Sequence, residues 1–180
     1  LVANAFWNQE GITVAAGTLQ VSTQANYFTF INRDGQYLEL SGSKDFGIRT
    51  KLEVPSGGFG GISLYAALPG GEWWQGAKRL DLGLENGQVS VSVWDGSSET
   101  PIIEQKFQAG SLPQVVELAV RKESGLLTIY ADGQPLGQVQ ENGLFSSGTI
   151  HFGLNVAPNT ELIVYSITAE AKNGQGVTVH

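Results

Sequence analysis

The sequence predicts an all-β protein folded as an antiparallel sandwich or barrel. Apolar and polar residues alternate through many short runs, which is the pattern of half-buried strands. No apolar stripe recurs at helical spacing over about ten residues, so at most one helical turn is expected, within 141–147. Turn sequences such as Asn86-Gly87 and Asp132-Gly133 separate the runs and favour hairpins.

The predicted strands follow one another with short connections and no repeating period. This argues against a propeller or a solenoid, whose repeats recur at a fixed spacing. In chain order, strands are predicted at 12–14, 19–22, 27–31, 37–40, 46–54, 62–68, 79–85, 88–94, 102–107, 115–122, 126–131, 134–139, 149–156 and 162–169.

Length and composition fit one folded domain. The chain has 180 residues with 41% hydrophobic content, enough to bury a substantial core. We assign 1–172 to a single β-sandwich domain. The stretch that begins at Asn173-Gly174 looks like the start of a linker or tail, 173–180.

The hairpin around Asn86-Gly87 organises the prediction. A two-residue type I′ turn fixes the register, because both central residues need positive φ. One face of the hairpin is then wholly apolar and is predicted to be core: Leu80, Leu82, Leu84, Val89, Val91 and Val93. The other face pairs Arg79 with Trp94, Asp81 with Ser92, Gly83 with Ser90 and Glu85 with Gln88. This polar face is either a solvated outer surface or the floor of a groove for a flat polar ligand.

Charge and residue usage narrow the function. A net charge of −7 without a basic cluster argues against nucleic acid, and no apolar run has the roughly 20 residues of a membrane span. The chain has no cysteine, which excludes disulfides, thiolate metal sites and a cysteine nucleophile. It also has no methionine and starts at Leu1, so we expect a processed or excised part of a longer protein.

Four stretches in this order resemble one superfamily. They are Trp7 with Gly17-Thr18-Leu19-Gln20-Val21, then 46–52, then 116–133 ending in Asp132-Gly133, and finally 164–168. The pattern is similar to that of the concanavalin A-like lectin and glucanase jelly rolls, which include laminin-G-like domains and carbohydrate-binding modules. The resemblance implies two packed antiparallel sheets, one of them curved, with sugar bound on the concave face or its rim.

On that resemblance, alternation gives the side chains of the concave face. Aromatic plates, a guanidinium and short polar groups suit a pyranose, which offers an apolar C–H face and hydroxyls. A loop with two adjacent tryptophans adds an aromatic feature near solvent. The predicted ligand-binding residues are Tyr65, Trp73, Trp74, Arg79, Asp81, Trp94, His151 and Asn155. Cation–π stacking alone would also account for Arg79 and Trp94.

Asp81 and Glu85 raise the alternative of catalysis. Retaining glucanases of this fold place carboxylates at alternate positions on one strand, and these two residues have that phase. Gly83 stands where the middle acid is expected, and four strand steps separate Asp81 from Glu85 by roughly 13 Å. Retention requires carboxyl groups about 5–5.5 Å apart. We therefore expect no catalytic residue.

Metals are expected at most in a structural role. No His, Asp and Glu cluster has zinc spacing. The resemblance implies that Asp34, Asp132 and Glu161, with backbone carbonyls, would supply oxygen ligands for a structural calcium ion. No cofactor is required.

These observations predict a non-catalytic carbohydrate-binding module that recognises a polysaccharide or oligosaccharide. We expect it to be secreted or at the cell surface and covalently linked to a polysaccharide-degrading catalytic domain. Two alternatives stay open: a laminin-G-like domain for adhesion or protein binding, and a weak or degenerate glycoside hydrolase.

Overall fold

The computed structural model describes residues 12–15, 18–23, 28–31, 40–41, 45–55, 57–68, 70–72, 74–108, 112, 114–146, 148–171 and 176–179. Over these residues the chain forms only strands, turns and loops, so the predicted all-β class is confirmed. In the same ranges there is no long apolar helix of the kind that crosses a membrane.

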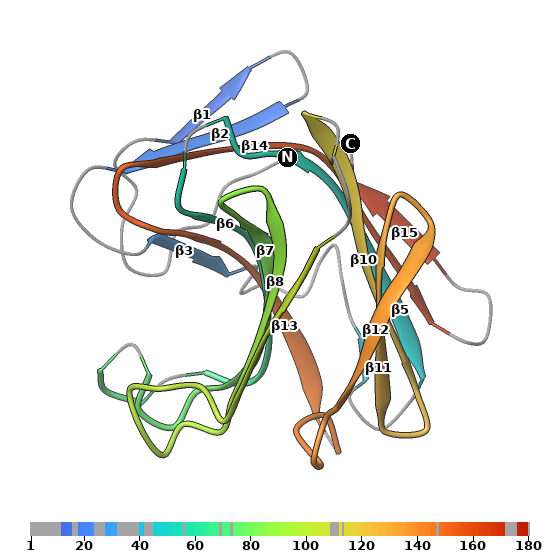
Figure 1. The fold of residues 1–180 in the computed structure, drawn as a ribbon. Coiled ribbons are helices and arrows are strands. Elements are labelled where there is room, and N and C mark those ends of the chain that lie inside the picture. Colours follow the sequence, from blue (N-terminus) through green and yellow to red (C-terminus); the bar gives the residue numbers. More distant parts are fainter. Residues whose placement is uncertain are drawn as a thin grey trace.

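The strands build two antiparallel sheets (Figure 1). The curved sheet has seven described strands. Six of them follow the order β3 (Phe28–Ile31), β13 (Thr149–Val156), β6 (Phe59–Ala67), β7 (Lys78–Glu85), β8 (Gln88–Trp94) and β9 (Ile103–Phe107), and β4 (Leu40–Ser41) also pairs with β13. In Figure 1 its strands arch so that the concave side opens to the left, away from β10 to β12.

The second sheet, called the back sheet below, has eight described strands. Seven follow the order β1 (Ile12–Ala15), β2 (Thr18–Thr23), β14 (Thr160–Ala171), β5 (Phe46–Glu53), β10 (Val115–Glu123), β11 (Leu126–Ala131) and β12 (Gln134–Gln140). The eighth, β15 (Gly176–Val179), pairs with β14 inside the segment predicted as a tail. The predicted tail thus contains a strand, because Val177 and Val179 alternate with Thr178 and extend the sheet. The domain boundary itself stays a prediction.

The core lies between the two sheets. The curved sheet contributes the apolar face of the β7–β8 hairpin, and all six residues predicted there are buried. The back sheet contributes fully buried residues such as Ile48, Leu52 and Leu118. Each such side chain stabilises the fold by about 1.5–3 kcal/mol through burial. The two-sheet sandwich predicted from alternation is therefore confirmed.

The β7–β8 turn has the predicted backbone. Asn86 has φ 50° and Gly87 has φ 76°, as a type I′ turn requires. All predicted cross-strand pairs are present, from Glu85 with Gln88 to Arg79 with Trp94. The register of this hairpin is therefore confirmed.

Strand β6 begins earlier than predicted. The sequence suggests a glycine-rich connection before residue 62, whereas Phe59, Gly60 and Gly61 already pair with β7. Gly61 lies opposite Gly83, and a Cβ at Gly61 would come within 2.2 Å of the Leu82 carbonyl oxygen. Glycine is needed here because the two backbones approach closely.

Candidate functional site

Four of the predicted site residues form one row across the concave face. His151 on β13 pairs with Tyr65 on β6, Tyr65 pairs with Arg79 on β7, and Arg79 pairs with Trp94 on β8. We call these four residues the Arg79 row. Because directly paired residues point to the same face of a sheet, the topology gathers side chains from distant parts of the sequence.

Arg79 is the centre of this row. Its Cζ lies 4.4 Å from the Trp94 ring centroid and 5.8 Å from that of Tyr65. Both distances are within the range of cation–π attraction, and the guanidinium is flanked by a ring on each neighbouring strand. The predicted stacking of Arg79 with Trp94 is confirmed.

A carboxylate and a hydroxyl in the next row hold Arg79 in place. The Nε of Arg79 donates to Oδ2 of Asp81 at 3.0 Å, and the Ser63 hydroxyl donates to Oδ1 at 2.5 Å. Ser63 is the cross-strand partner of Asp81. The two carboxylate oxygens are thus engaged by different donors, which fixes the carboxylate and with it the guanidinium.

The interpretation of this face as a solvated surface is wrong. Arg79 is 3% exposed and Asp81 is 4% exposed. Four further side chains that face this side are buried as well: Ser63, Tyr65, Ser90 and Asn155. Burial is tolerated because Arg79, Asp81 and Ser63 satisfy one another.

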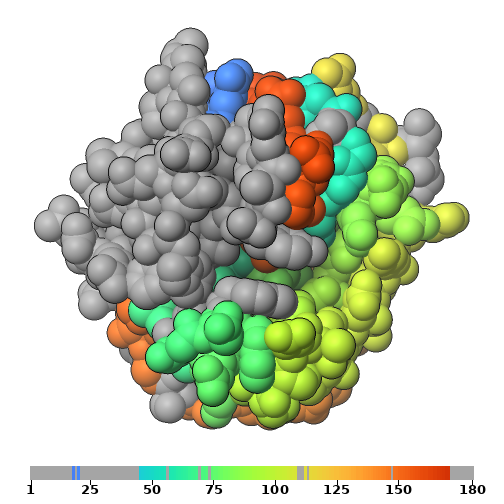
Figure 2. Space-filling model, turned by 90° about the vertical axis from the view of Figure 1, so that its left-hand side faces the viewer, coloured from blue at the N-terminus to red at the C-terminus, as the bar shows by residue number. Residues whose placement is uncertain are grey.

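Two residues of the row, Trp94 and His151, are only half-buried. Next to Trp94 lie two loop segments, 70–77 without Trp73 and 95–101, which we call the lip. The amide of Gly76 donates to the carbonyl of Gly96 at 2.9 Å, so the segments lie side by side. Figure 2 faces this side, and green and yellow-green atoms of the two segments meet at its lower edge.

The lip brings Trp74 to the same end of the sheet as the row. Trp74 is half-buried, and its carbonyl accepts from the amide of Ala77 at 3.0 Å. Asp95 lies at the end of β8 and accepts from the Ser97 hydroxyl at 2.6 Å and the Ser97 amide at 2.9 Å. These hydrogen bonds lower the pKa of the Asp95 carboxyl below its ordinary value, because they stabilise the charged form.

Asn155 lies on the same face but away from the row. It is four positions beyond His151 on β13, which is about 13 Å along a strand. Its cross-strand partner is Gly61, which in turn faces Gly83. Its Oδ1 is buried, and no hydrogen-bond donor from the described part of the chain reaches it. The ring of Phe59 lies over Gly83, since a Cβ there would come within 2.8 Å of its Cζ.

Of the eight predicted site residues, the structure gathers five at one end of the concave face: Tyr65, Trp74, Arg79, Trp94 and His151. Asp81 lies in the next row and bonds to Arg79, whereas Asn155 lies four positions from His151 along β13. Trp73 lies outside the described residues. Their binding role stays a prediction, since geometry alone does not test it.

Ser63 is the member of the network that the predicted site omits. Its partnership with Asp81 depends on the register between β6 and β7. The connection between these strands is long, and a bulge between Tyr65 and Ala67 shifts the pairing. Neither can be derived from the alternation of a single strand. The only signal in the sequence is that Ser63 lies on the predicted concave face together with Asp81.

The two acids with a catalytic spacing are both engaged. Asp81 is bound by Arg79 and Ser63, and Glu85 forms an ion pair of 2.8 Å with Lys106. The hydrogen bond from Lys106 to Glu85 raises the pKa of this lysine. Gly83, between the two acids on the strand, supplies no third carboxylate.

Metal ligands do not converge in the described part of the chain, where no group of three or more His, Asp or Glu residues is placed to hold an ion. Asp132 instead accepts from the amide of Glu117 at 2.9 Å. Asp34 lies outside the described residues, so the calcium site with Asp132 and Glu161 stays a prediction.

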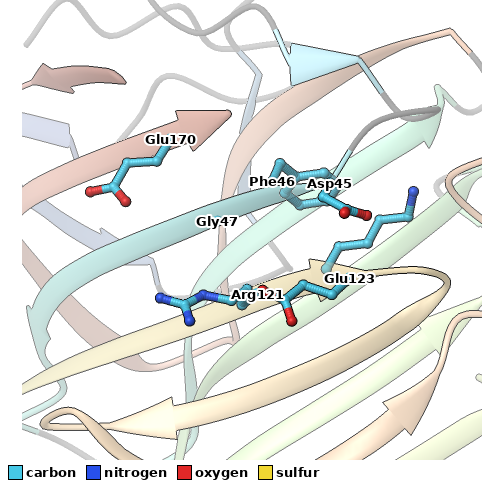
Figure 3. Close-up of a pocket in the computed structure, with 7 residues that line it drawn as sticks. Asp45, Phe46, Gly47, Arg121, Glu123 and Glu170 are labelled. Atoms are coloured by element: carbon cyan, nitrogen blue, oxygen red, sulfur yellow. The ribbon is translucent and has the colours of Figure 1, made fainter. Parts of the chain in front are cut away.

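Apart from the concave face, a small hollow lies on the outer face of the back sheet. It holds about 110 Å³ over Gly47, whose cross-strand neighbours are Glu170 and Arg121. Figure 3 shows the two charged side chains on either side of the bare glycine. Arg121 lies 5.8 Å from the Tyr130 ring centroid, and Arg49 bridges Glu170 at 2.6 Å. These arginines and Glu170 are exposed, in contrast to the Arg79 row.

No model of a protein family and no curated protein matches the sequence. Solved structures do match. The catalytic domain of an endo-1,3-beta-glucanase (laminarinase) from Thermotoga petrophila RKU-1 has a TM-score of 0.69 and 14% identity, covering 92% of this chain and 82% of that one. Alginate lyase A1-II′, of polysaccharide lyase family 7, has a TM-score of 0.62 and 11% identity, with 92% and 85% covered.

A third match is the carbohydrate recognition domain of Emp46p in its potassium-bound form. Its TM-score is 0.64 and its identity 13%, over 88% of this chain and 84% of that one. All three cover most of both chains at low identity, so the likeness concerns the fold. The superfamily fold implied by the sequence resemblance is confirmed.

Proposed function

The chain has the concanavalin A-like jelly-roll fold, and we propose that it is a non-catalytic carbohydrate-binding module for polysaccharides. One observation carries the proposal. A guanidinium, fixed by a buried carboxylate, stacks on a half-buried tryptophan on the concave face, beside a lip that bears a second tryptophan. A fixed aromatic surface next to polar groups is what a pyranose ring requires.

In this proposal, Trp94 and Trp74 stack on sugar rings, and Tyr65 and His151 complete the row. Arg79, Asp81 and Ser63 hold Trp94 in place from behind, because they are buried and bonded to one another. Pre-organisation lowers the entropy cost of binding. The solved structures that share the fold support the polysaccharide class, since their names include a laminarinase, an alginate lyase and a carbohydrate recognition domain.

The absence of catalysis is part of the proposal. The ion pairs of Asp81 and Glu85 support it, because both carboxylates are already engaged by cationic side chains of this chain. We propose in addition that the module is secreted or on the cell surface and acts beside a linked catalytic domain. Slow release of reducing sugar from a β-glucan that is lost in a Glu85→Gln protein would favour a hydrolase instead.

The test is a gel-shift panel over xylan, β-glucan, mannan, levan, cellulose and alginate, followed by isothermal titration with the selected glycan. Trp94→Ala should weaken binding by 2 kcal/mol or more, roughly thirtyfold, as expected for an aromatic hot spot. Trp74→Ala should weaken it in the same direction. Tyr130→Ala is the matched control, since Tyr130 also lies beside an arginine but on the back sheet. Circular dichroism and the melting temperature confirm that the variants fold.

Equal affinities of Trp94→Ala, Trp74→Ala and the wild type would overturn the site. If no glycan in the panel binds, the proposed carbohydrate function is overturned and the laminin-G-like alternative is favoured.

A further inference from the structure

We infer that the Arg79 row and its lip select uncharged glycans and reject polyuronates. The inference rests on the proposed function and specifies its ligand class. An exposed arginine in a sugar site usually indicates a carboxylate ligand, because guanidinium and carboxylate form strong paired hydrogen bonds. The burial of Arg79 and the charges around it argue instead for an uncharged ligand.

The charge of Arg79 is already neutralised. Asp81 contacts it at 3.0 Å, and both side chains of the pair are about 95% buried. A uronate placed on the far side of the Trp94 ring would therefore meet a guanidinium whose field is cancelled at short range by its own carboxylate. It would gain little from the one cation of the row.

The surroundings of the row are acidic. Residues 70–108, which contain the lip and strands β7 to β9, hold six carboxylates and three cations. With the Arg79–Asp81 pair set aside, five carboxylates face two lysines, and Lys106 is paired with Glu85. The exposed acids are Glu72, Asp95, Glu99 and Glu104. A polyanion approaching the lip is repelled by these charges, and the net charge of −7 adds to the repulsion.

The test compares laminarin, a neutral glucan, with alginate, a polyuronate, by isothermal titration at about 20 mM and 150 mM salt, where screening differs strongly. Wild-type protein should bind laminarin, or the neutral glycan selected by the panel, with little salt dependence. Alginate should bind at least about tenfold more weakly, and least at low salt. Tighter binding of alginate than of every neutral glycan would overturn the inference and leave the proposed function standing. Binding of no glycan would overturn both.

Two surface variants sharpen the test without touching the buried pair. Glu104→Gln removes one exposed charge near the row, and Glu123→Gln removes one from the back sheet. Both change the net charge equally. The first should raise alginate affinity severalfold at low salt and leave laminarin unchanged, and the second should change neither. Equal effects of the two variants would show that only net charge matters and would overturn a local selection at the row.

Discussion

The two sheets each carry an arginine beside an aromatic ring, in opposite environments. On the curved sheet, Arg79 lies 4.4 Å from Trp94 and is buried with its carboxylate. On the back sheet, Arg121 lies 5.8 Å from Tyr130, is exposed, and has no ion pair within the described residues. An arginine beside an aromatic ring thus forms a buried, ion-paired platform on one sheet and an exposed surface pair on the other. The difference is the buried carboxylate of Asp81, two positions beyond Arg79 on the same strand.

The largest expected difference concerns the stability of the ion pairs. Asp81→Ala removes the carboxylate that lies 3.0 Å from the buried guanidinium of Arg79 and should lower the free energy of unfolding by about 3–5 kcal/mol. Glu170→Ala breaks the ion pair with Arg49, in which the side chains of Arg49 and Glu170 are 48% and 54% exposed. This change should lower the free energy of unfolding by only about 0–1 kcal/mol. Urea unfolding measures both.

Arg79→Met/Asp81→Ala is the control for this interpretation. It removes both charges and should regain part of the lost stability, since apolar side chains are tolerated better than a buried charge whose ion-pair carboxylate has been removed. Similar losses for Asp81→Ala and Glu170→Ala would mean that the Arg79 network is not buried in solution.

The glycines of the two sheets should differ as well. A Cβ at Gly83 would lie 2.5 Å from the carbonyl oxygen of Gly60, so Gly83→Ala should cost about 1–3 kcal/mol through strain. A Cβ at Gly47 would meet nothing closer than 3.9 Å, so Gly47→Ala should be neutral or stabilise by about 0.4–1 kcal/mol. Thermal unfolding distinguishes the two. A neutral Gly83→Ala would contradict the close approach of β6 and β7.

This geometry also changes how the floor of the concave face can be tested. A bulky residue at Gly83 would not simply fill a groove, because even a methyl group meets the neighbouring backbone. Loss of binding in such a variant would report distortion of the sheet. The lip residues are better positions for a steric test.

A smaller difference is expected when arginine is replaced by lysine. Arg79→Lys keeps the charge but loses the planar group that stacks on Trp94, so glycan affinity should fall about tenfold. Arg121→Lys on the back sheet should leave affinity unchanged. Isothermal titration with the glycan from the panel measures both. An unchanged affinity for Arg79→Lys would mean that the platform does not depend on the guanidinium.

The sequence was sufficient for features that depend on local pattern. Alternation and the Asn86-Gly87 turn predicted the β7–β8 register, and from it the apolar core face and the pairing of Arg79 with Trp94. The early start of β6 escaped prediction because Gly60 and Gly61 were interpreted as a connection. Glycine there reflects the approach of a strand that pairs only in three dimensions.

Burial of the polar face could not be predicted from alternation. The pattern shows which side chains share a face but not how the sheet curves or what they contact. The contact of Ser63 with Asp81 depends on the bulge in β6, and the approach of the lip segments depends on the bond between Gly76 and Gly96. These long-range contacts turn an apparently solvated strip into a buried network.

The smallest expected effect concerns the pH dependence of unfolding, and it also separates the two regions. Hydrogen bonds from Ser97 lower the pKa of Asp95 on the lip. Its contribution to stability is therefore complete above the unfolded pKa of about 3.9 and is lost as the pH falls through the lower folded value. On the back sheet, the hydrogen bond from Tyr165 to Glu53, 2.8 Å long, raises the tyrosine pKa. That contribution is complete below about pH 10 and is lost as the pH rises through the raised folded value.

Two variants test these opposite pH dependences of the free energy of unfolding. In a plot of the urea midpoint against pH, Asp95→Asn should flatten the acid limb and leave the slope of the alkaline limb unchanged. Tyr165→Phe should flatten the alkaline limb and leave the slope of the acid limb unchanged. Both groups are near solvent, so the changes should be small, and they should shrink further at high salt where the charges are screened. The measurement is the urea midpoint as a function of pH, followed on both sides of the ordinary pKa values of about 3.9 and 10. A changed slope of the alkaline limb in Asp95→Asn would mean that the lip and the back sheet are electrostatically coupled, contrary to the separation of the two faces by an apolar core.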